Sequence, residues 1–368
     1  MPACILISLM AVLLLYGCTH TAPFRDNQGR IVPGSIAAME TISIGGIPQQ
    51  LWFRGIDTHN PALLILHGGP GISEAALYRH FDSELEQHFL VVNWEQRGTG
   101  RSFHTDIPSE SMTIAQFLRD LDEVVELIRE RFQKNNVVLL GESWGTALGT
   151  IYSVQHPEKV GAYVGIGHAA NMPHGERLSY DYALTQAMAR SDEKAVKELT
   201  AIGSPPHTVD EMLASRRWVE RFGGSFHADL STGKLIWAAL NTDEVNLVDL
   251  ILFGRGNRFS LEQLWPEFSQ LDLTIYKKFE TPVFFLLGRS DWQVPAILAA
   301  SYFKSIEAPC KQLIWFERSA HHPPFEQPEE FNRVMIEDVL PAATGSTTFV
   351  KQSKSQDDSC ERRSHVER

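Results

Sequence analysis

The sequence predicts an α/β protein with a mostly parallel β-sheet flanked by helices. Short apolar, β-branched runs recur along the chain and are separated by turn residues and helical patterns, as in consecutive βα units. These runs are almost continuously apolar, which is typical of strands buried on both faces of a sheet. With 368 residues, of which 43% are hydrophobic, the chain can fill a sizeable core and is neither disordered nor fibrous.

Composition excludes several classes of function. Lys and Arg total 33 against 45 Asp and Glu, and the resulting net charge of −12 repels nucleic-acid backbones and anionic lipid surfaces. The four cysteines have no C-x-x-C spacing, so neither a disulfide scaffold nor a structural zinc site is expected. We therefore expect no metal, no cofactor and no nucleic-acid partner.

The amino terminus carries an apolar run at residues 3–16, and no Asp, Glu, Lys or Arg precedes Arg25. The run is too short to span a bilayer but has the proportions of a secretory h-region. It ends at Leu-Tyr-Gly-Cys, residues 15–18, and this end resembles a bacterial lipoprotein signal. The resemblance implies that residues 1–18 are a signal and that a lipid on Cys18 holds the exported protein at the outer membrane or periplasmic face of a Gram-negative bacterium.

Other readings of this terminus stay open, namely a plain cleaved signal, an uncleaved anchor or a cytosolic start. Export would also permit a disulfide between Cys310 and Cys360.

A polar linker, residues 19–35, precedes the folded core. A hairpin then opens the sheet, with strands at 41–44 and 50–53 around a turn that contains Gly45, Gly46 and Pro48. Further buried strands are predicted at 62–67, 89–94, 137–141, 162–167, 283–288 and 312–316.

The clearest helix begins after Thr113 and continues to Phe132, with apolar residues at helical spacing. Thr113 and Gln116 have the spacing of a capping box. Asp120 and Asp122 lie on this helix, where we expect them to be solvated.

The strand pattern stops between residues 171 and 275, where polar helical stretches predict an inserted helical lid. The lid divides the core into a first part, 36–170, and a second part, 276–341. The segment 342–368 is polar and has too few apolar residues to order itself, so it is predicted to be a disordered tail.

The chemistry centres on Gly-Glu-Ser-Trp-Gly at residues 141–145, which joins a predicted strand to a helical stretch at 146–155. A G-x-S-x-G motif in this context is a nucleophile elbow, in which a strained turn exposes the serine hydroxyl. Ser143 is therefore the candidate nucleophile. A serine hydroxyl needs a base, and the base needs a carboxylate to orient it.

Both partners follow predicted strands in the expected order. Asp291 lies in the loop after the strand 283–288, and His321 and His322 follow the strand 312–316. The chain order Ser143, Asp291, His321 is that of α/β-hydrolases. For the oxyanion hole, Trp144 supplies one backbone N–H, and the His-Gly-Gly-Pro-Gly loop at 67–71 supplies the other, for which we select Gly69.

Three motifs carry a resemblance to the proline iminopeptidase family of α/β-hydrolases: residues 67–71, Trp-Glu-Gln-Arg-Gly-Thr-Gly-Arg-Ser at 94–102, and residues 141–145. The segment from His321 to Glu326 is similar to the histidine segment of that family and favours His321 over His322 as the base. The resemblance covers residues 42–340. It implies an α/β-hydrolase fold and serine hydrolase chemistry through an acyl-enzyme.

The same resemblance implies an aminopeptidase that releases N-terminal proline from short peptides. Such an enzyme holds the substrate ammonium with carboxylates, for which Glu142 and Glu176 are the candidates. A carboxylesterase or lactonase with the same triad is the alternative enzyme. An inert, surface-anchored binding module is the alternative of another class, and the intact triad argues against it.

Overall fold

The computed structural model describes residues 20–227 and 230–345. The predicted signal with Cys18 and most of the predicted tail lie outside these residues. Cys360 does so too, so its pairing with the buried, disulfide-bonded Cys310 stays a prediction. Within the described ranges, no helix is long and apolar enough to cross a membrane.

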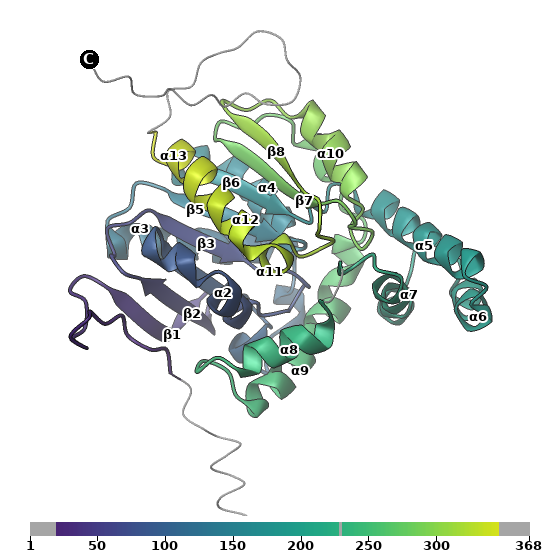
Figure 1. Ribbon diagram of the computed structural model, residues 1–368, viewed down its shortest axis with the longest axis horizontal. Coiled ribbons are helices and arrows are strands. Elements are labelled where there is room, and N and C mark those ends of the chain that lie inside the picture. The colour runs from purple at the N-terminus through teal and green to yellow at the C-terminus, as the bar shows by residue number, and fades with distance from the viewer. Residues whose placement is uncertain (1–19, 228–229, 346–368) are drawn as a thin grey trace, which may run out of the picture.

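One eight-stranded sheet forms the centre of the molecule, in the order β1-β2-β4-β3-β5-β6-β7-β8 (Figure 1). β1 pairs antiparallel with β2 and β2 with β4, whereas all pairs from β4 to β8 are parallel. The strand bounds are Ile36–Ile44, Ile47–Gly55, Ala62–Leu66, Leu90–Glu95, Val137–Glu142, Val160–Ile166, Val283–Gly288 and Lys311–Phe316 for β1 to β8. The predicted α/β class with a mostly parallel sheet is confirmed.

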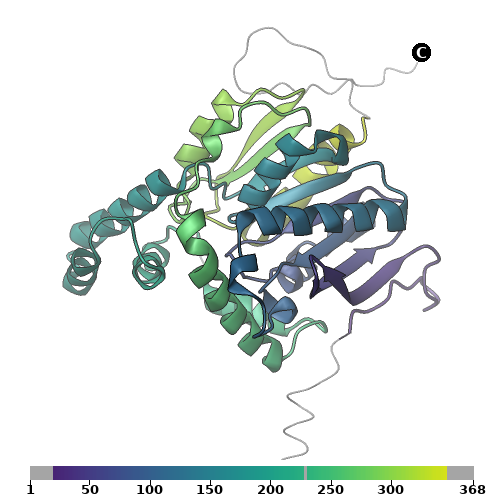
Figure 2. The same ribbon diagram turned by 180° about the vertical axis from the view of Figure 1, so that it is seen from behind.

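Helices cover both faces of the sheet, as Figures 1 and 2 show from opposite sides. One apolar cluster joins the sheet to α3, α4 and α10, and the second joins the other face to α2 and the carboxyl-terminal helices. The helices of the first face are α3 (Ile114–Phe132), α4 (Gly145–Gln155) and α10 (Ala296–Ser305). Those of the second are α2 (Ala75–Phe81), α11 (Pro323–Glu326), α12 (Pro328–Val334), a π-helical turn (Met335–Val339) and α13 (Leu340–Ala343).

Five helices occupy the chain between β6 and β7, and we call this segment the insertion. They are α5 (Met172–Ala189), α6 (Glu193–Ile202), α7 (Val209–Arg221), α8 (Thr232–Leu240) and α9 (Leu247–Phe268). α5, α6 and α7 project to one side of the sheet, whereas α8 and α9 lie along its lower end in Figure 1. α5, α6 and α7 share a small apolar cluster that is separate from the two clusters of the sheet and that includes Tyr180 and Trp218.

The structure departs from the sequence predictions at a few local points. The hairpin turn contains only Gly45 and Gly46, because Pro48 pairs with Ser43 inside the ladder. Thr113 caps α3 by accepting from the N–H of Gln116 at 3.2 Å. The Gln116 side chain does not complete the capping box, because its oxygen accepts from Arg119 instead.

Asp120 is fully buried, so the prediction that it is solvated is wrong. It accepts from Arg97 Nε at 2.9 Å and from Gln49 Nε2 at 2.9 Å. The charge on Asp120 is therefore paired in the interior, where it holds the loop that contains Arg97 against α3. Asp122, by contrast, is 40% exposed at its side chain and pairs with Lys159.

Candidate active site

Ser143 lies in a sharp turn between β5 and α4, with φ of 51°. Its N–H donates to the carbonyl of Ile166 at 2.9 Å, and its carbonyl accepts from Thr146. A left-handed φ is costly for a residue with a side chain and is characteristic of strained functional turns. The flanking glycines are sterically required: a Cβ on Gly141 would lie 2.6 Å from the Gly145 oxygen, and one on Gly145 would lie 1.9 Å from the Leu66 oxygen.

We expect Gly145→Ala to lower the free energy of unfolding by about 3 kcal/mol or more, because the new methyl group overlaps a backbone oxygen that cannot move without disturbing β3. Urea denaturation measures this change. Gly254→Ala, in α9, is the matched control, because no heavy atom lies within 4 Å of its added Cβ and alanine favours the helix by about 1 kcal/mol. Equal stability of the two variants would contradict this account of the elbow.

Asp291 and His321 come together at the carboxyl edge of the sheet. His321 Nδ1 lies 2.8 Å from Asp291 Oδ2, and both side chains are 1% exposed. The other Asp291 oxygen accepts from the N–H of Val294. His321 Nε2 is buried and has no hydrogen-bond partner among the described residues. The Asp291 contact fixes the imidazole tautomer with Nδ1 protonated, which leaves Nε2 as a proton acceptor.

The end of β6 links this pair to Ser143. Ile166 accepts the hydrogen bond from the Ser143 N–H, and the next residue, Gly167, lies directly against the His321 ring. A Cβ on Gly167 would lie 2.6 Å from His321 Cε1. All three candidate catalytic residues therefore lie at one edge of the sheet.

Glu326 holds the loop that carries His321, a role that no motif in the sequence indicates. One of its carboxylate oxygens accepts from the Ser319 hydroxyl and from the N–H groups of Ala320 (2.7 Å) and His322 (3.3 Å). Three hydrogen bonds to one carboxylate fix the backbone on both sides of His321.

The predicted oxyanion loop has the backbone freedom of glycine at its centre. Gly69 has φ of 112°, and a Cβ there would lie 2.6 Å from the Gly71 nitrogen. The N–H of Gly68 is committed to Glu74 Oε2 at 2.9 Å. Within the described part of the chain, the N–H groups of Gly69 and Trp144 make no hydrogen bond, so both are available to a reacting oxygen.

Gln96 connects the three sequence motifs. Its N–H donates to His67 Nε2 at 3.1 Å, and its side-chain oxygen accepts from Trp144 Nε1 at 2.8 Å. His67 is buried, which lowers its pKa to about 4 and keeps the ring neutral. The Trp144 ring is fully buried and packs edge-on against Phe268, so it supports the elbow.

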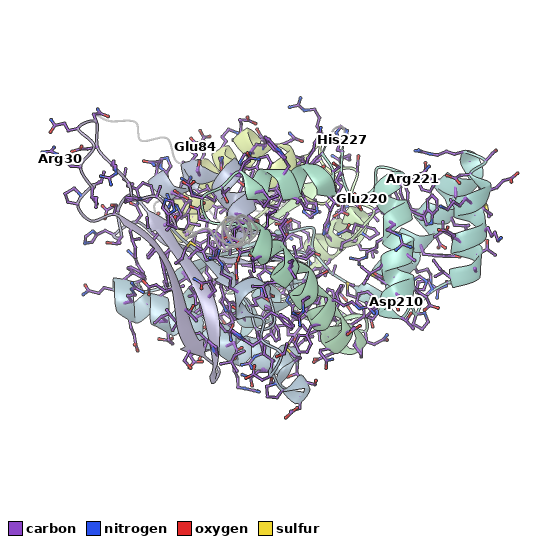
Figure 3. The ribbon with its side chains drawn as sticks, turned by 90° about the horizontal axis from the view of Figure 1, so that it is seen from below. Arg30, Glu84, Asp210, Glu220, Arg221 and His227 are labelled. Atoms are coloured by element: carbon purple, nitrogen blue, oxygen red, sulfur yellow. The ribbon has the colours of Figure 1, made fainter. Side chains whose placement is uncertain are left out.

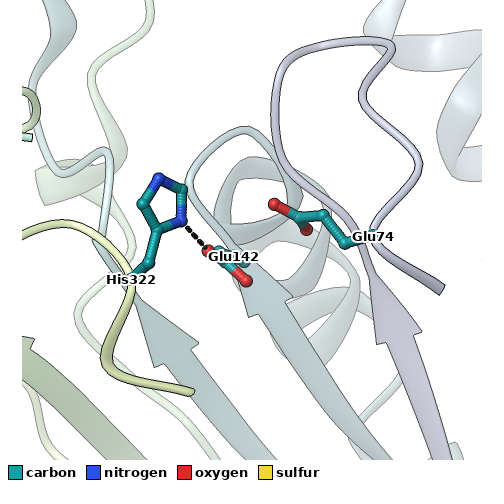
Figure 4. A group of neighbouring side chains, drawn as sticks. All are labelled: Glu74, Glu142 and His322. Carbon is teal, nitrogen blue, oxygen red and sulfur yellow. Dashed lines mark hydrogen bonds and ion pairs between the residues drawn. The ribbon is translucent and has the colours of Figure 1, made fainter. Parts of the chain in front are cut away.

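Glu142 and His322, the sequence neighbours of Ser143 and His321, belong with Glu74 to a second group of ionisable side chains (Figure 4). Glu142 is fully buried, and its two oxygens contact His322 Nδ1 (2.7 Å) and the Tyr78 hydroxyl (2.9 Å). Burial and then the nearby Glu142 charge raise the pKa of Glu74 well above its usual range, and these two carboxyl groups share a hydrogen bond. Burial lowers the pKa of His322, but the hydrogen bond and charge of Glu142 outweigh this and raise it.

One ligand atom from each of Glu74, Glu142 and His322 lies within 4.8 Å of the others, so these groups could hold a cation. Their existing hydrogen bonds already satisfy them without one. The sequence did not indicate this cluster, because no motif shows that Glu74 packs against Glu142 and His322.

Glu176, the second candidate for binding an ammonium group, lies on α5 and forms an ion pair with Arg216 at 2.7 Å. Its side chain is 8% exposed and borders a small cavity next to Pro295 and Leu298. The structure does not bring Glu176 into contact with Glu142. Each of the two candidate carboxylates therefore has a partner already.

The sheet order, the elbow and the His–Asp pair define a class of protein. The family model for the alpha/beta hydrolase fold matches residues 61–328, and the chain belongs to this family. The fold and the resemblance to proline iminopeptidase-like hydrolases, both predicted from sequence, are confirmed.

Several known proteins are similar to this chain over most of its length. The "Probable aminopeptidase YbaC" of Bacillus subtilis is 34% identical over 302 residues, 81% of this chain and 94% of the relative. A proline iminopeptidase of Heyndrickxia coagulans is 25% identical over 74% of this chain and 88% of its own length. The crystal structure of a Mycobacterium smegmatis proline iminopeptidase superposes with a TM-score of 0.61 at 16% identity, covering 84% of this chain and all of the other.

Proposed function

We propose that the protein is a serine hydrolase that acts through an acyl-enzyme on Ser143. The observation that carries the proposal is the buried Asp291–His321 pair, whose unpartnered Nε2 lies at the same sheet edge as the strained Ser143. His321 Nε2 takes the Ser143 proton as the oxygen attacks a substrate carbonyl. The N–H groups of Gly69 and Trp144 stabilise the resulting oxyanion.

The intermediate then collapses. The carbon–nitrogen or carbon–oxygen bond to the leaving group breaks, and His321 returns the proton to that group. Water, deprotonated by His321, attacks the acyl-Ser143 carbonyl, and the second collapse releases the acid and restores the serine hydroxyl.

The preferred substrate in this proposal is a short peptide with N-terminal proline. The names of the two relatives and the three shared motifs support it. Glu142 and Glu176 are the candidate carboxylates for the substrate ammonium, and the insertion α5–α9 serves as the lid over the site.

A carboxylesterase or lactonase is the second candidate, and one observation favours it. Glu142 is paired with His322, and Glu176 is paired with Arg216. A neutral ester would need neither carboxylate, whereas an ammonium group needs a charge that is not already compensated.

A fluorophosphonate probe tests the hydrolase proposal, because it reacts only with an activated serine. We expect labelling of the wild-type protein and none of Ser143→Ala, measured by mass spectrometry of the intact chain. An unlabelled wild-type protein with native circular dichroism would favour an inert binding module. A panel of prolyl amides and short-chain esters then separates peptidase from esterase.

For localisation, we propose an exported protein with a lipid on Cys18. We expect labelled palmitate to enter the wild-type protein in a Gram-negative host, the protein to fractionate with the outer membrane, and Cys18→Ser to remove the label and change processing. Cys310→Ser is the control for loss of a cysteine as such, because Cys310 is buried and disulfide-bonded and so is no acceptor for a lipid. Absence of label from the wild-type protein would refute lipidation.

A further inference from the structure

Large apolar side chains are exposed on α8 and at the start of α9, the next helix along the chain. Ile236 and Trp237, in the second half of α8, are 45% and 66% exposed, and Leu247 and Ile251, on one face of the start of α9, are 51% and 61% exposed. We call these four residues the α8–α9 patch. Single exposed apolar residues are ordinary on a protein surface, but a group on two consecutive helices is a sign of an interaction site.

The stretch that carries the patch, residues 235–253, lacks the polar outer face of a normal surface helix, whereas the exposed Lys234 and Arg255 flank it. Leu235, Leu240, Leu250 and Phe253 pack inward against the core, yet the outward side is apolar as well. From residue 235 to 253 the charged residues are Asp243, Glu244 and Asp249, and the last two are buried. A helical stretch that is apolar on its outer as well as its inner side is suited to a buried or membrane-facing position.

The start of the described chain is fastened beside this patch. The N–H of His20 donates to the carbonyl of Asp243 at 3.2 Å, and the Thr21 hydroxyl donates to Glu244 at 2.8 Å. Arg54 Nη1 donates to the carbonyl of Ala22 at 3.0 Å. Asp243 and Glu244 lie in the loop between α8 and α9, and these helices face the viewer in Figure 3, which looks from below.

This attachment limits where a membrane anchor can lie. Cys18 precedes His20 by two residues, so a lipid on Cys18 begins within about 7 Å of the position of His20. If the apolar run 3–16 stays uncleaved, its last residue is within about 14 Å. Either anchor would enter the bilayer next to the α8–α9 patch.

We propose that the α8–α9 patch inserts into the interfacial region of the bilayer to which the amino terminus is anchored. This inference rests on the membrane anchoring in the proposed function, and it is independent of the substrate. Trp237 suits the boundary between headgroups and acyl chains, where tryptophan is enriched in membrane proteins. The net charge of −12 favours zwitterionic over anionic lipid.

Docking in this way would connect the membrane to the oxyanion loop. Farther along α9, Asn257 Nδ2 donates to the carbonyl of Pro70 at 2.8 Å, directly after Gly69. The Ser260 hydroxyl donates to the carbonyl of Gly98 at 3.1 Å. A bilayer that binds the start of α9 would therefore hold in place the helix that contacts the oxyanion loop at residues 67–71.

Bromine quenching of tryptophan fluorescence tests the proposal on the full chain, purified with its anchor and reconstituted into phosphatidylcholine vesicles with brominated acyl chains. Trp237 is the only one of the eight tryptophans with more than half of its surface exposed. We expect the lipid-quenched part of the emission to fall about twofold or more in Trp237→Phe, because the other indoles are shielded by protein. Trp315→Phe, on β8 and away from the insertion, is the control and should keep the wild-type quenching.

Equal quenching in all three proteins, or none in any of them, would overturn the proposal. If Trp237 emission instead shifts with protein concentration and not with lipid, the patch is a contact between copies of the chain, and the proposal is wrong. If the protein fails to float with the vesicles, it is not anchored to the membrane, and the proposal is wrong. Fluorophosphonate labelling of the same sample reports separately whether the hydrolase proposal stands.

Discussion

Replacement of His321 by alanine is expected to lower kcat by about four to six orders of magnitude, whereas His322→Ala should cost less than about a hundredfold. His321 is oriented by Asp291, whose Oδ2 lies 2.8 Å from its Nδ1, and its buried Nε2 has no partner among the described residues and is left to act as the base. His322 is adjacent in sequence, but its Nδ1 is engaged by Glu142 and its ring stacks on Phe226. Steady-state hydrolysis of a prolyl amide or an activated ester measures both variants.

Thermal unfolding of both variants shows whether a loss of activity is caused by a loss of stability. Comparable losses of activity in both, with unchanged melting curves, would mean that the two imidazoles act as a unit. A larger loss in His322→Ala than in His321→Ala would reverse the assignment of the base.

A free prolyl amide should be cleaved two to three orders of magnitude faster than its N-acylated counterpart if the enzyme is an aminopeptidase. Removing one partner of a buried ion pair costs roughly 3 to 5 kcal/mol, which corresponds to about two to four orders of magnitude in kcat/KM, and the expected preference lies in the lower part of this range. If Glu142 binds the substrate ammonium, Glu142→Gln should erase this preference. If Glu176 binds it, Glu176→Gln should do so instead. Hydrolysis of a small neutral ester should change little in that variant.

Glu330→Gln is the matched control for the two glutamate variants. Glu330→Gln alters an exposed glutamate that pairs with Arg333, and it should leave the amine preference intact. If the wild-type enzyme cleaves free and blocked substrates equally, or hydrolyses only esters, then the carboxylesterase proposal replaces the peptidase proposal.

Much of the fold could be predicted because its signals are local in sequence. Each buried strand is a continuous apolar run bounded by turn residues, and α3 carries its apolar residues at helical spacing. The candidate triad could also be predicted, because the ends of parallel strands converge and the order Ser143, Asp291, His321 follows the order of the strands.

Contacts between distant segments could not be predicted in the same way. The helical pattern places Asp120 at a position that is indistinguishable in sequence from Asp122, yet the loop with Arg97 covers one and not the other. Glu326 and Glu74 are polar residues near turns, and nothing local indicates that the first fastens the His321 loop or that the second lies against Glu142.

The pairing of Glu74 with Glu142 has a consequence for proton uptake. A carboxyl group whose pKa is raised in the folded state binds a proton there that it releases in the unfolded chain, so folding takes up a proton at Glu74 at pH values between the unfolded pKa and the folded one. Its contribution is therefore most favourable in acid and declines as the pH rises from the unfolded pKa toward the folded one. The charge of the cluster beside Ser143 therefore changes with pH through Glu74, whose carboxyl group lies against Glu142 and His322.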